Sequence, residues 1–323
     1  MAPPLLSVRH LVTRFRTGRG QITAVNDVSF DVAAGETVAI VGESGSGKSV
    51  TALSILRLIP DPPGHIESGE ILFDGKDLLK MNDAEIRAVR GNRIAMIFQE
   101  PMSSLNPSLT VGLQVGEPIH LHRQAPWSVA LEKARELLGL VRMSDTASRV
   151  AAYPHQFSGG MRQRAMIAMA LACEPQLIIA DEPTTALDVT VQAQILDLLK
   201  DLADRTGSAL VLITHDLGVV ARYADRVVVM YAGRVVESAP ASQLYARPRH
   251  PYTQGLMASV PRLDGDTHVR LVPIEGQPPD LARIPEGCAF APRCKQATDA
   301  CRQASPPLRD IDHRHQVACI LEV

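Results

Sequence analysis

The chain has 323 residues, of which 46% are apolar and 21% are charged, and its formal net charge at pH 7 is −2. This composition is ample for a buried core, and the length predicts either one large domain with an extension or two domains. A charge so close to neutral gives no electrostatic reason to expect nucleic acid as the main partner. No apolar run approaches the ~20 residues that span a bilayer, and the N-terminus lacks the apolar core of a signal peptide. We therefore expect any membrane role to come from docking onto another chain.

The N-terminal part predicts strands that lead into a phosphate-binding loop. Two strands are expected over residues 5–15 and 24–32, joined by a glycine-rich turn. The β-branched apolar run at residues 37–41 predicts a short buried strand. Residues 42–49 then read Gly-Glu-Ser-Gly-Ser-Gly-Lys-Ser, which matches the pattern G-x-x-x-x-G-K-[ST], and a helix is expected over about residues 49–58.

The residue types of this loop predict a site for the phosphates of a nucleotide. Glycines let the backbone curl, so that its N–H groups face a single anion. The ammonium group of Lys48 can reach the β- and γ-phosphates, and the hydroxyl of Ser49 can ligate Mg²⁺. The positive end of the following helix adds to the attraction. The residues expected to bind the nucleotide here are Gly42, Glu43, Ser44, Gly45, Ser46, Gly47, Lys48 and Ser49.

Between the loop and residue 172 the character of the sequence changes. A strand is predicted at residues 70–73, a capped helix start at Asn82, and a buried strand at residues 94–98 that ends at Gln99. Strand patterns are missing from residues 100–172, where helical spacing dominates. This stretch therefore predicts a helical insertion within an α/β core.

The second half of the chain alternates between strands and helices up to about Ser238. The predicted elements are strands at residues 177–180, 209–214 and 226–231, with helices at residues 189–206 and 217–223. Such alternation implies a parallel sheet covered by helices. After Ser238 prolines accumulate and the alternation ends.

Three further motifs follow the loop in a fixed order. Ser158-Gly159-Gly160 suits the start of a helix over residues 159–172, because a serine hydroxyl is a good N-cap. Asp181-Glu182 ends one apolar strand, and His215 follows another. With these four ordered motifs, residues 5–245 resemble the ATP-binding subunit of an ABC transporter. The resemblance implies an α/β P-loop NTPase of ABC type, with a mixed sheet core and an inserted helical subdomain.

The resemblance also implies an ATPase that uses ATP and Mg²⁺, with a role for each motif residue. Ser49 and Asp181 would hold Mg²⁺, with Gln99 as a further contact. Glu182 would polarise the attacking water, and His215 would contact the γ-phosphate and fix that water.

Two such domains sandwich ATP head to tail in the family this chain resembles. The helix start at Ser158, Gly159 and Gly160 would then bind the γ-phosphate held by the other subunit. Met161 stands where the common family signature has glutamine, which suggests that the partner ATPase is a different chain. Phe15 matches the family aromatic that stacks on adenine, although an ordinary core or edge aromatic is the alternative reading.

Two stretches resemble the dipeptide, oligopeptide and nickel branch of ABC importers: residues 100–107, where the permease docks in the family, and residues 250–253. The expected domains are an ABC domain at residues 1–245, with its insertion at about 100–172, and an importer-type extension at 246–323. The implied partners are a second ATPase in a heterodimer, two permease chains and, indirectly, a substrate-binding protein, with no nucleic acid. The chain would then lie peripherally on the cytoplasmic face of the cell inner membrane.

The transported substrate stays open, because ABC ATPases do not touch the cargo. Dipeptides, longer peptides, nickel complexes and glutathione all fit the branch. The alternative function is that of an ABC ATPase acting on nucleic acid or ribosomes. Such proteins usually carry two cassettes, coiled-coil insertions or basic arms, and the sequence shows none of these.

Four of the five cysteines fall in the extension, with the spacing C-x5-C-x6-C-x17-C. A cytosolic ATPase disfavours disulfides, and four thiolates in a proline-rich segment suggest a metal staple. The spacing is not that of a paired C-x2-C zinc ribbon. Some importer ATPases of this type carry a [4Fe–4S] cluster here, so the resemblance implies such a cluster. Zinc, or thiols without a ligand, are the alternatives, with His313 and His315 as other candidate ligands. The cysteines concerned are Cys288, Cys294, Cys301 and Cys319.

Overall fold

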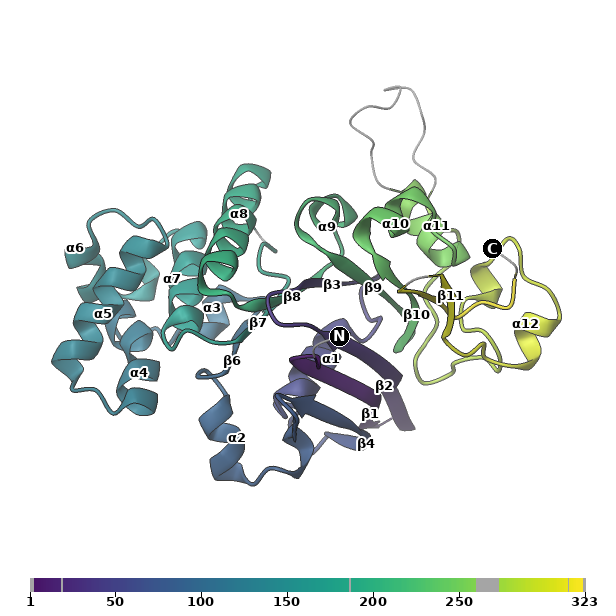
Figure 1. Ribbon diagram of the computed structural model, residues 1–323, viewed down its shortest axis with the longest axis horizontal. Helices are drawn as coiled ribbons and strands as arrows, with labels where there is room; N and C mark the ends of the chain where they lie inside the picture. The colour runs from purple at the N-terminus through teal and green to yellow at the C-terminus, as the bar shows by residue number, and fades with distance from the viewer. Residues whose placement is uncertain (1–2, 19, 186, 260–272, 313, 322–323) are drawn as a thin grey trace. The chain divides into compact units, whose positions relative to one another are not determined.

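A computed structural model describes the whole chain except residues 1–2, 19, 186, 260–272, 313 and 322–323 (Figure 1). The chain divides into two compact units. The first consists of Met1–Val32, Thr37–Leu79 and Thr214–Val323, and the second of Ala33–Glu36 and Lys80–Ile213.

An antiparallel sheet with strand order β2-β1-β4-β5 forms one part of the first unit. Both expected N-terminal strands are confirmed, but β2 and β4 begin earlier than predicted. Pairing with β1 extends them through polar residues, and Phe15 of β1 stands opposite Gly64 at the start of β4. The strands are β1 (Leu6–Thr17), β2 (Gly20–Val32), β4 (Gly64–Phe73) and β5 (Lys76–Asp77).

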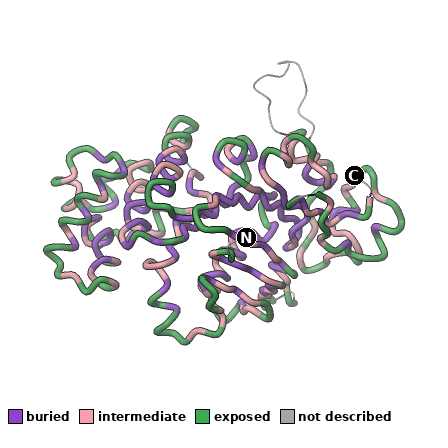
Figure 2. The backbone as a smooth tube through the Cα atoms, in the orientation of Figure 1, coloured by how far each residue is buried: buried purple, intermediate pink, exposed green. Residues whose placement is uncertain are grey.

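The second sheet of the first unit has the order β11-β12-β10-β9-β3. Only β3 and β9 pair in parallel, and the other neighbours are antiparallel, so the sheet is mixed. Every residue of β3 is buried, which explains why it reads as an unbroken apolar run (Figure 2). The strands are β3 (Thr37–Val41), β9 (Arg226–Tyr231), β10 (Arg234–Pro240), β11 (Arg309–Asp312) and β12 (His315–Val317).

The helices of the first unit bury their apolar faces against this sheet or start at its strand ends. Leu217, Leu244 and Tyr252 belong to one core cluster with β9 residues. Figure 1 shows α9, α10 and α11 grouped together. The helices are α1 (Lys48–Ile55), α9 (Leu217–Tyr223), α10 (Ala241–Ala246), α11 (Pro251–Ala258) and α12 (Ala300–Gln303), with single turns at η1 (Leu78–Lys80) and η3 (Ala291–Arg293).

The C-terminal extension contains regular structure that the sequence pattern does not reveal. The hairpin of β11 and β12 adds to the edge of β10, with Glu237 opposite Val317. A buried hydrogen bond fixes this hairpin, because His315 Nε2 lies 2.8 Å from Glu237 Oε1 and both residues are buried. The backbone N–H groups of Arg249 and His250 donate to the same carboxylate, at 2.8 and 2.9 Å. The extension therefore packs as part of the first unit.

The second unit is built on three parallel strands in the order β8-β7-β6. Nearly all of their residues are buried, and all three strands were predicted. The strands are β6 (Ile94–Ile97), β7 (Leu177–Asp181) and β8 (Ala209–Thr214), and the flanking helices are α2 (Asp83–Val89) and α8 (Val189–Thr206).

Helices fill the stretch from residue 100 to 172, as expected, and α4, α5 and α7 contact one another (Figure 1). Within residues 100–107, α3 begins at Pro101 and ends at Ser104, so the helix does not continue through the whole stretch. Proline is tolerated at the first position of a helix, where its missing N–H group costs no hydrogen bond. The elements are α3 (Pro101–Ser104), α4 (Val111–Arg123), α5 (Trp127–Leu140), α6 (Thr146–Ala151), η2 (Pro154–Gln156) and α7 (Gly159–Leu171).

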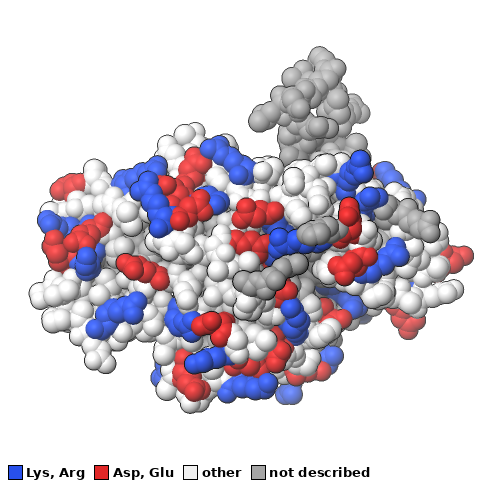
Figure 3. Space-filling model, viewed as in Figure 1, with Lys and Arg blue, Asp and Glu red and all other residues white. Residues whose placement is uncertain are grey.

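Two surface properties bear on possible partners. Among the described residues, none of the helices combines the length and hydropathy needed to cross a membrane. On the face drawn in Figure 3, basic and acidic side chains are interspersed. That mixture agrees with the small net charge of the whole chain.

Candidate functional site

The glycine-rich loop connects β3 to α1 in the first unit, as its pattern predicts. Gly42 and Gly47 have φ angles of 152° and 101°, which side chains with a Cβ rarely adopt. A Cβ at Gly42 would lie 2.2 Å from the Met230 carbonyl oxygen, and one at Gly47 would lie 2.5 Å from that of Ala24. The loop needs glycine at both positions, because its backbone lies directly against neighbouring backbone.

Lys48 and the helix start behind it provide the positive groups of this loop. The buried Lys48 ammonium donates to the carbonyl oxygens of Gly42 and Glu43, at 2.8 and 3.0 Å. Ser49 follows within the first turn of α1, and no side chain caps the described start of that helix at Gly47. The backbone N–H groups and the positive end of a helix start suit an anion. The arrangement can therefore bind phosphate.

Phe15 lies on β1, where it is half-buried. Its ring lies over Gly64, because a Cβ at that glycine would approach the ring to 2.6 Å. This contact accounts for Gly64 at the paired position on β4. Stacking of Phe15 on adenine stays a prediction.

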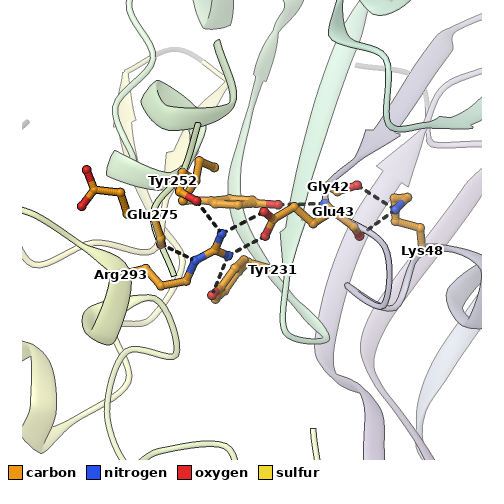
Figure 4. A network of polar contacts seen from close by, with 8 residues as sticks. Gly42, Glu43, Lys48, Tyr231, Tyr252, Glu275 and Arg293 are labelled. Atoms are coloured by element: carbon orange, nitrogen blue, oxygen red, sulfur yellow. Dashed lines mark hydrogen bonds and ion pairs between the residues drawn. The ribbon is translucent and has the colours of Figure 1, made fainter. Parts of the chain in front are cut away.

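The extension contacts the loop directly, through residues that the sequence patterns did not single out (Figure 4). The Arg293 guanidinium donates to both carboxylate oxygens of Glu43, at 2.6 and 3.0 Å. The backbone N–H of Glu43 donates to the hydroxyl of Tyr252 at 2.8 Å. Burial raises the pKa of both Tyr252 and Tyr231, so both phenols are neutral at physiological pH. In the sequence, Arg293 is marked only by its neighbour Cys294, a candidate metal ligand. Tyr252 is marked only because residues 250–253 resemble the importer branch.

Glu182 and Gln99, two predicted catalytic residues, meet in the second unit. Gln99 Nε2 donates to Glu182 Oε2 at 3.1 Å, and Thr185 Oγ1 donates to the same oxygen at 2.9 Å. Asp181 is buried at the end of β7, directly before Glu182. Glu182 has a φ angle of 44°, in the left-handed region where only glycine rests without cost. Such strain is common at functional sites and fixes the direction of the carboxylate.

The predicted helix start at Ser158 is confirmed. Ser158 Oγ accepts from the backbone N–H of Met161 at 3.4 Å, and both Ser158 and Gly159 are exposed. A Cβ at Gly160 would lie 3.0 Å from Val191 of α8, so glycine keeps this helix start close to its neighbour. An exposed helix start is available to an anion from another molecule. His215 is also exposed; it belongs to the first unit with the loop, whereas Gln99, Ser158, Asp181 and Glu182 belong to the second.

The structure brings the four cysteines of the extension near one another but does not show the predicted metal site. Burial raises the pKa of the Cys288 thiol, with neighbouring Cys319 and Cys301 adding to the shift, and the same two thiols act on Cys294. The four sulfurs therefore gather in one part of the extension. However, within the part of the chain that is described, no three His, Cys, Asp or Glu side chains are placed to hold a metal ion. The iron–sulfur prediction for Cys288, Cys294, Cys301 and Cys319 is thus not supported by this geometry.

The histidines named as other candidate ligands do not change this result. His315 contacts Glu237 through its Nε2 atom, in a pair that fixes the hairpin of the extension. His313 lies outside the described residues.

Comparison with known proteins covers nearly the whole chain. Residues 25–185 match the family described as ABC transporter, and residues 236–301 match the family described as Oligopeptide/dipeptide transporter, C-terminal region. The oligopeptide transport ATP-binding protein OppD of Bacillus subtilis is 51% identical over 313 residues, covering 97% of this chain and 87% of that protein. The dipeptide transport ATP-binding protein DppD of the same organism is 51% identical over 318 residues, covering 98% and 95%. A dimeric ATP-binding cassette solved in a post-hydrolysis state with ADP and Pi is 29% identical with a TM-score of 0.66, covering 73% of this chain and 98% of that one.

Proposed function

Because the chain belongs to the ATP-binding proteins of the oligopeptide and dipeptide ABC transporters, we propose that it is the subunit whose ATP hydrolysis powers peptide import. The observation that carries this proposal is the presence of two family regions in one chain. An ABC region covers residues 25–185, and an importer-type C-terminal region covers residues 236–301. The alternative, an ABC ATPase acting on nucleic acid or ribosomes, has no support from either region.

Each motif residue has a proposed role in ATP hydrolysis. Lys48 and the loop amides bind the phosphates, while Ser49 and Asp181 hold Mg²⁺, which supplies charge neutralisation on the phosphates. Glu182 orients and polarises the attacking water, and His215 contacts the γ-phosphate. The hydrogen bonds that Gln99 and Thr185 donate to Glu182 support this assignment, because they fix the direction of its carboxylate.

The proposed partners follow from the exposed surfaces. Ser158 would bind the nucleotide of a second ATPase, and the solved dimeric cassette with ADP and Pi supports such pairing. Met161, in place of the common glutamine, favours a different chain as that partner. Met102 on α3 is 64% exposed, which supports this stretch as the place where a permease docks. With two permease chains and a substrate-binding protein, the assembly would lie at the cytoplasmic face of the membrane.

We also propose that the four cysteines of the extension bind a metal cluster. Four thiols in one part of the extension suit four-cysteine ligation, so Cys288, Cys294, Cys301 and Cys319 would hold a [4Fe–4S] cluster. Zinc is the alternative, because it also binds four thiolates. The cluster would be structural, since no electron-transfer partner is implied.

Peptide uptake by cells that lack this chain tests the proposed function. Labelled dipeptide and pentapeptide uptake should fall in the deletion strain and return with the wild-type chain. Lys48→Ala should not restore uptake, because it removes the charge that binds the phosphates. The exposed Lys295→Gln, which breaks only a surface ion pair with Glu275, should restore it fully. Unchanged uptake of both peptides in the deletion strain would contradict peptide import.

A further inference from the structure

The loop Gly42–Ser49 carries an acidic residue, Glu43, although its proposed ligand is a polyanion. A carboxylate beside a phosphate site repels the ligand unless its charge is neutralised. Here Arg293 neutralises it through a bidentate ion pair, with nitrogen–oxygen distances of 2.6 and 3.0 Å. The Arg293 side chain is only 5% exposed and that of Glu43 is 27% exposed. Water therefore screens this pair far less than a surface ion pair.

The surroundings of Arg293 hold its guanidinium in one orientation (Figure 4). Its Nε atom donates to the Glu275 carbonyl oxygen at 3.0 Å, and a second nitrogen donates to that of Ile274 at 3.3 Å. The Tyr231 hydroxyl accepts a further hydrogen bond at 3.3 Å. The Tyr231 and Phe290 rings also face the guanidinium, at 5.9 and 6.0 Å. The planar fork is thus fixed by the extension before it meets Glu43.

Other residues of the extension reach the same segment of the loop. The Tyr252 hydroxyl accepts from the backbone N–H of Glu43, and Tyr252 is fully buried. A cavity of about 110 Å³ is lined on one side by the loop and on the other by the extension. Its lining includes Ser44, Gly45, Pro278 and Leu281. The extension thus contacts the first half of the loop, before Lys48.

We propose that Arg293 is a positioning residue of the nucleotide site, which acts through Glu43 by neutralising its carboxylate beside the phosphate-binding loop. The inference rests on the proposed placement of ATP at this loop. It makes the C-terminal extension part of the ATP site rather than an appendage. Lys48 is the other charged side chain of the loop. When Arg293 neutralises Glu43, the positive charge of Lys48 acts on the phosphates without an opposing negative charge from Glu43.

If the charge of Glu43 matters, each substitution in this pair should change the affinity for ATP in its own direction. Arg293→Gln leaves Glu43 unneutralised and should weaken ATP binding by about 10-fold, the size expected of one poorly screened charge. Glu43→Gln leaves an extra positive charge, so ATP should bind at least as tightly as to the wild type. The double variant removes both charges and should return to within about threefold of the wild-type affinity. Arg293→Lys keeps the charge and should retain most of the affinity.

The experiment measures the affinity of the full-length chain for a fluorescent ATP analogue and the matching ADP analogue, with thermal unfolding to check folding. The loss in Arg293→Gln should be larger for the ATP analogue, which carries one more negative charge. Lys295→Gln is the matched control. It also removes a positive charge, two residues along the chain from Arg293, but this charge belongs to an exposed ion pair with Glu275. Its affinities should stay within about twofold of the wild type.

A purely structural clamp predicts different results and would overturn the proposal. Both single variants would then bind both nucleotides more weakly by the same factor, and the double variant would be no better than Arg293→Gln. If Arg293→Gln does not fold, Glu43→Gln decides, because weaker ATP binding by that variant contradicts charge neutralisation. Lys48→Ala separates this failure from failure of the proposed function: if it binds ATP as the wild type does, the loop is not the nucleotide site.

Discussion

Glu182 is held by both its backbone conformation and its hydrogen bonds. Its φ angle of 44° is costly for a residue with a side chain, and two donors converge on one of its oxygens. A carboxylate that is fixed in direction can orient an attacking water molecule, as the proposed role of Glu182 requires.

Lys48 and Glu182 should therefore fail in different ways when replaced. Lys48→Ala should abolish productive ATP binding, because the buried ammonium is lost from the loop. Glu182→Gln should retain ATP binding but lower the hydrolysis rate by about 100-fold or more. Equilibrium binding and phosphate release, measured on the same preparations with the partner ATPase present, check both. Near wild-type hydrolysis by Glu182→Gln would show that another group activates the water.

His250 gives a prediction about pH. Burial lowers the pKa of His250 to about 4 from its usual 6.5, and its Nδ1 atom accepts from the Tyr252 backbone N–H. The Glu237 carboxylate accepts from the His250 backbone N–H and contacts His315 Nε2. Because the folded state holds the neutral ring, the unfolded state gains a proton first as the pH falls. The stability that His250 contributes is complete above about pH 6.5 and is lost progressively toward pH 4.

The loss between these pH values amounts to about 3 kcal/mol. Urea unfolding at several pH values measures it as a slope of stability against pH. His250→Asn should flatten this slope while keeping a side-chain acceptor for the helix cap. The exposed His155→Asn is the control and should leave the slope unchanged. An identical slope in His250→Asn would mean that other groups cause the acid sensitivity.

At the scale of elements, α7 is a helix whose start is exposed and capped only by Ser158. If this start binds a nucleotide held by another chain, a bulky cation at Ser158 should act on the partner and not on its own loop. Ser158→Arg should lower ATP hydrolysis at the partner's site while this chain's affinity for ATP stays unchanged. Mixed dimers with one inactive loop at a time measure the two sites separately. Full ATP hydrolysis by the isolated monomer would contradict action across an interface.

Local sequence patterns predicted the elements that are buried on both faces and the helices that follow them. The runs at β3, β7 and β8 are uniformly apolar because both faces of these strands are covered. The early part of β4 and the hairpin of β11 and β12 escaped prediction, because their residues are polar or irregularly spaced. Pairing with a distant strand forms them, and that information is not local.

The same division applies to the candidate site. The loop, Asp181-Glu182 and the Ser158 helix start were predicted because each stands at a fixed place beside a strand or helix. Arg293 and Tyr252 could not be found in this way, since they reach Glu43 from 250 and 209 positions away in the chain. Only the tertiary fold of the extension brings them to the loop.

For the whole molecule, the extension combines a modest core, a cluster of cysteines and a contact to the loop. The buried Glu237–His315 pair anchors its hairpin, and Phe290 packs beside Tyr231 and Tyr252. Arg293 ends the single turn η3, immediately before Cys294. Whatever holds the four cysteines together should therefore also hold Arg293 against Glu43.

This arrangement predicts that loss of the proposed cluster lowers the affinity of the chain for ATP. Protein purified without oxygen should be brown and contain about four irons per chain, as a four-cysteine cubane requires. Cys294→Ser should bleach the protein, make the extension protease-sensitive, and weaken ATP binding by the same factor as Arg293→Gln. The two effects should not add in the double variant, because both act through one contact.

Three results would contradict this prediction, two of them for the cluster and one for its coupling to the loop. Colourless anaerobic protein with about one zinc per chain would replace the cluster by a tetrahedral site, and absence of any metal would leave the cysteines without a staple. Additive losses of affinity in Cys294→Ser with Arg293→Gln would show that the cysteines affect the loop by another route. Cys173→Ser is the control, because this fifth cysteine is buried in the second unit and burial raises its pKa. Its replacement should leave the iron content, the colour and the affinity for ATP as in the wild type.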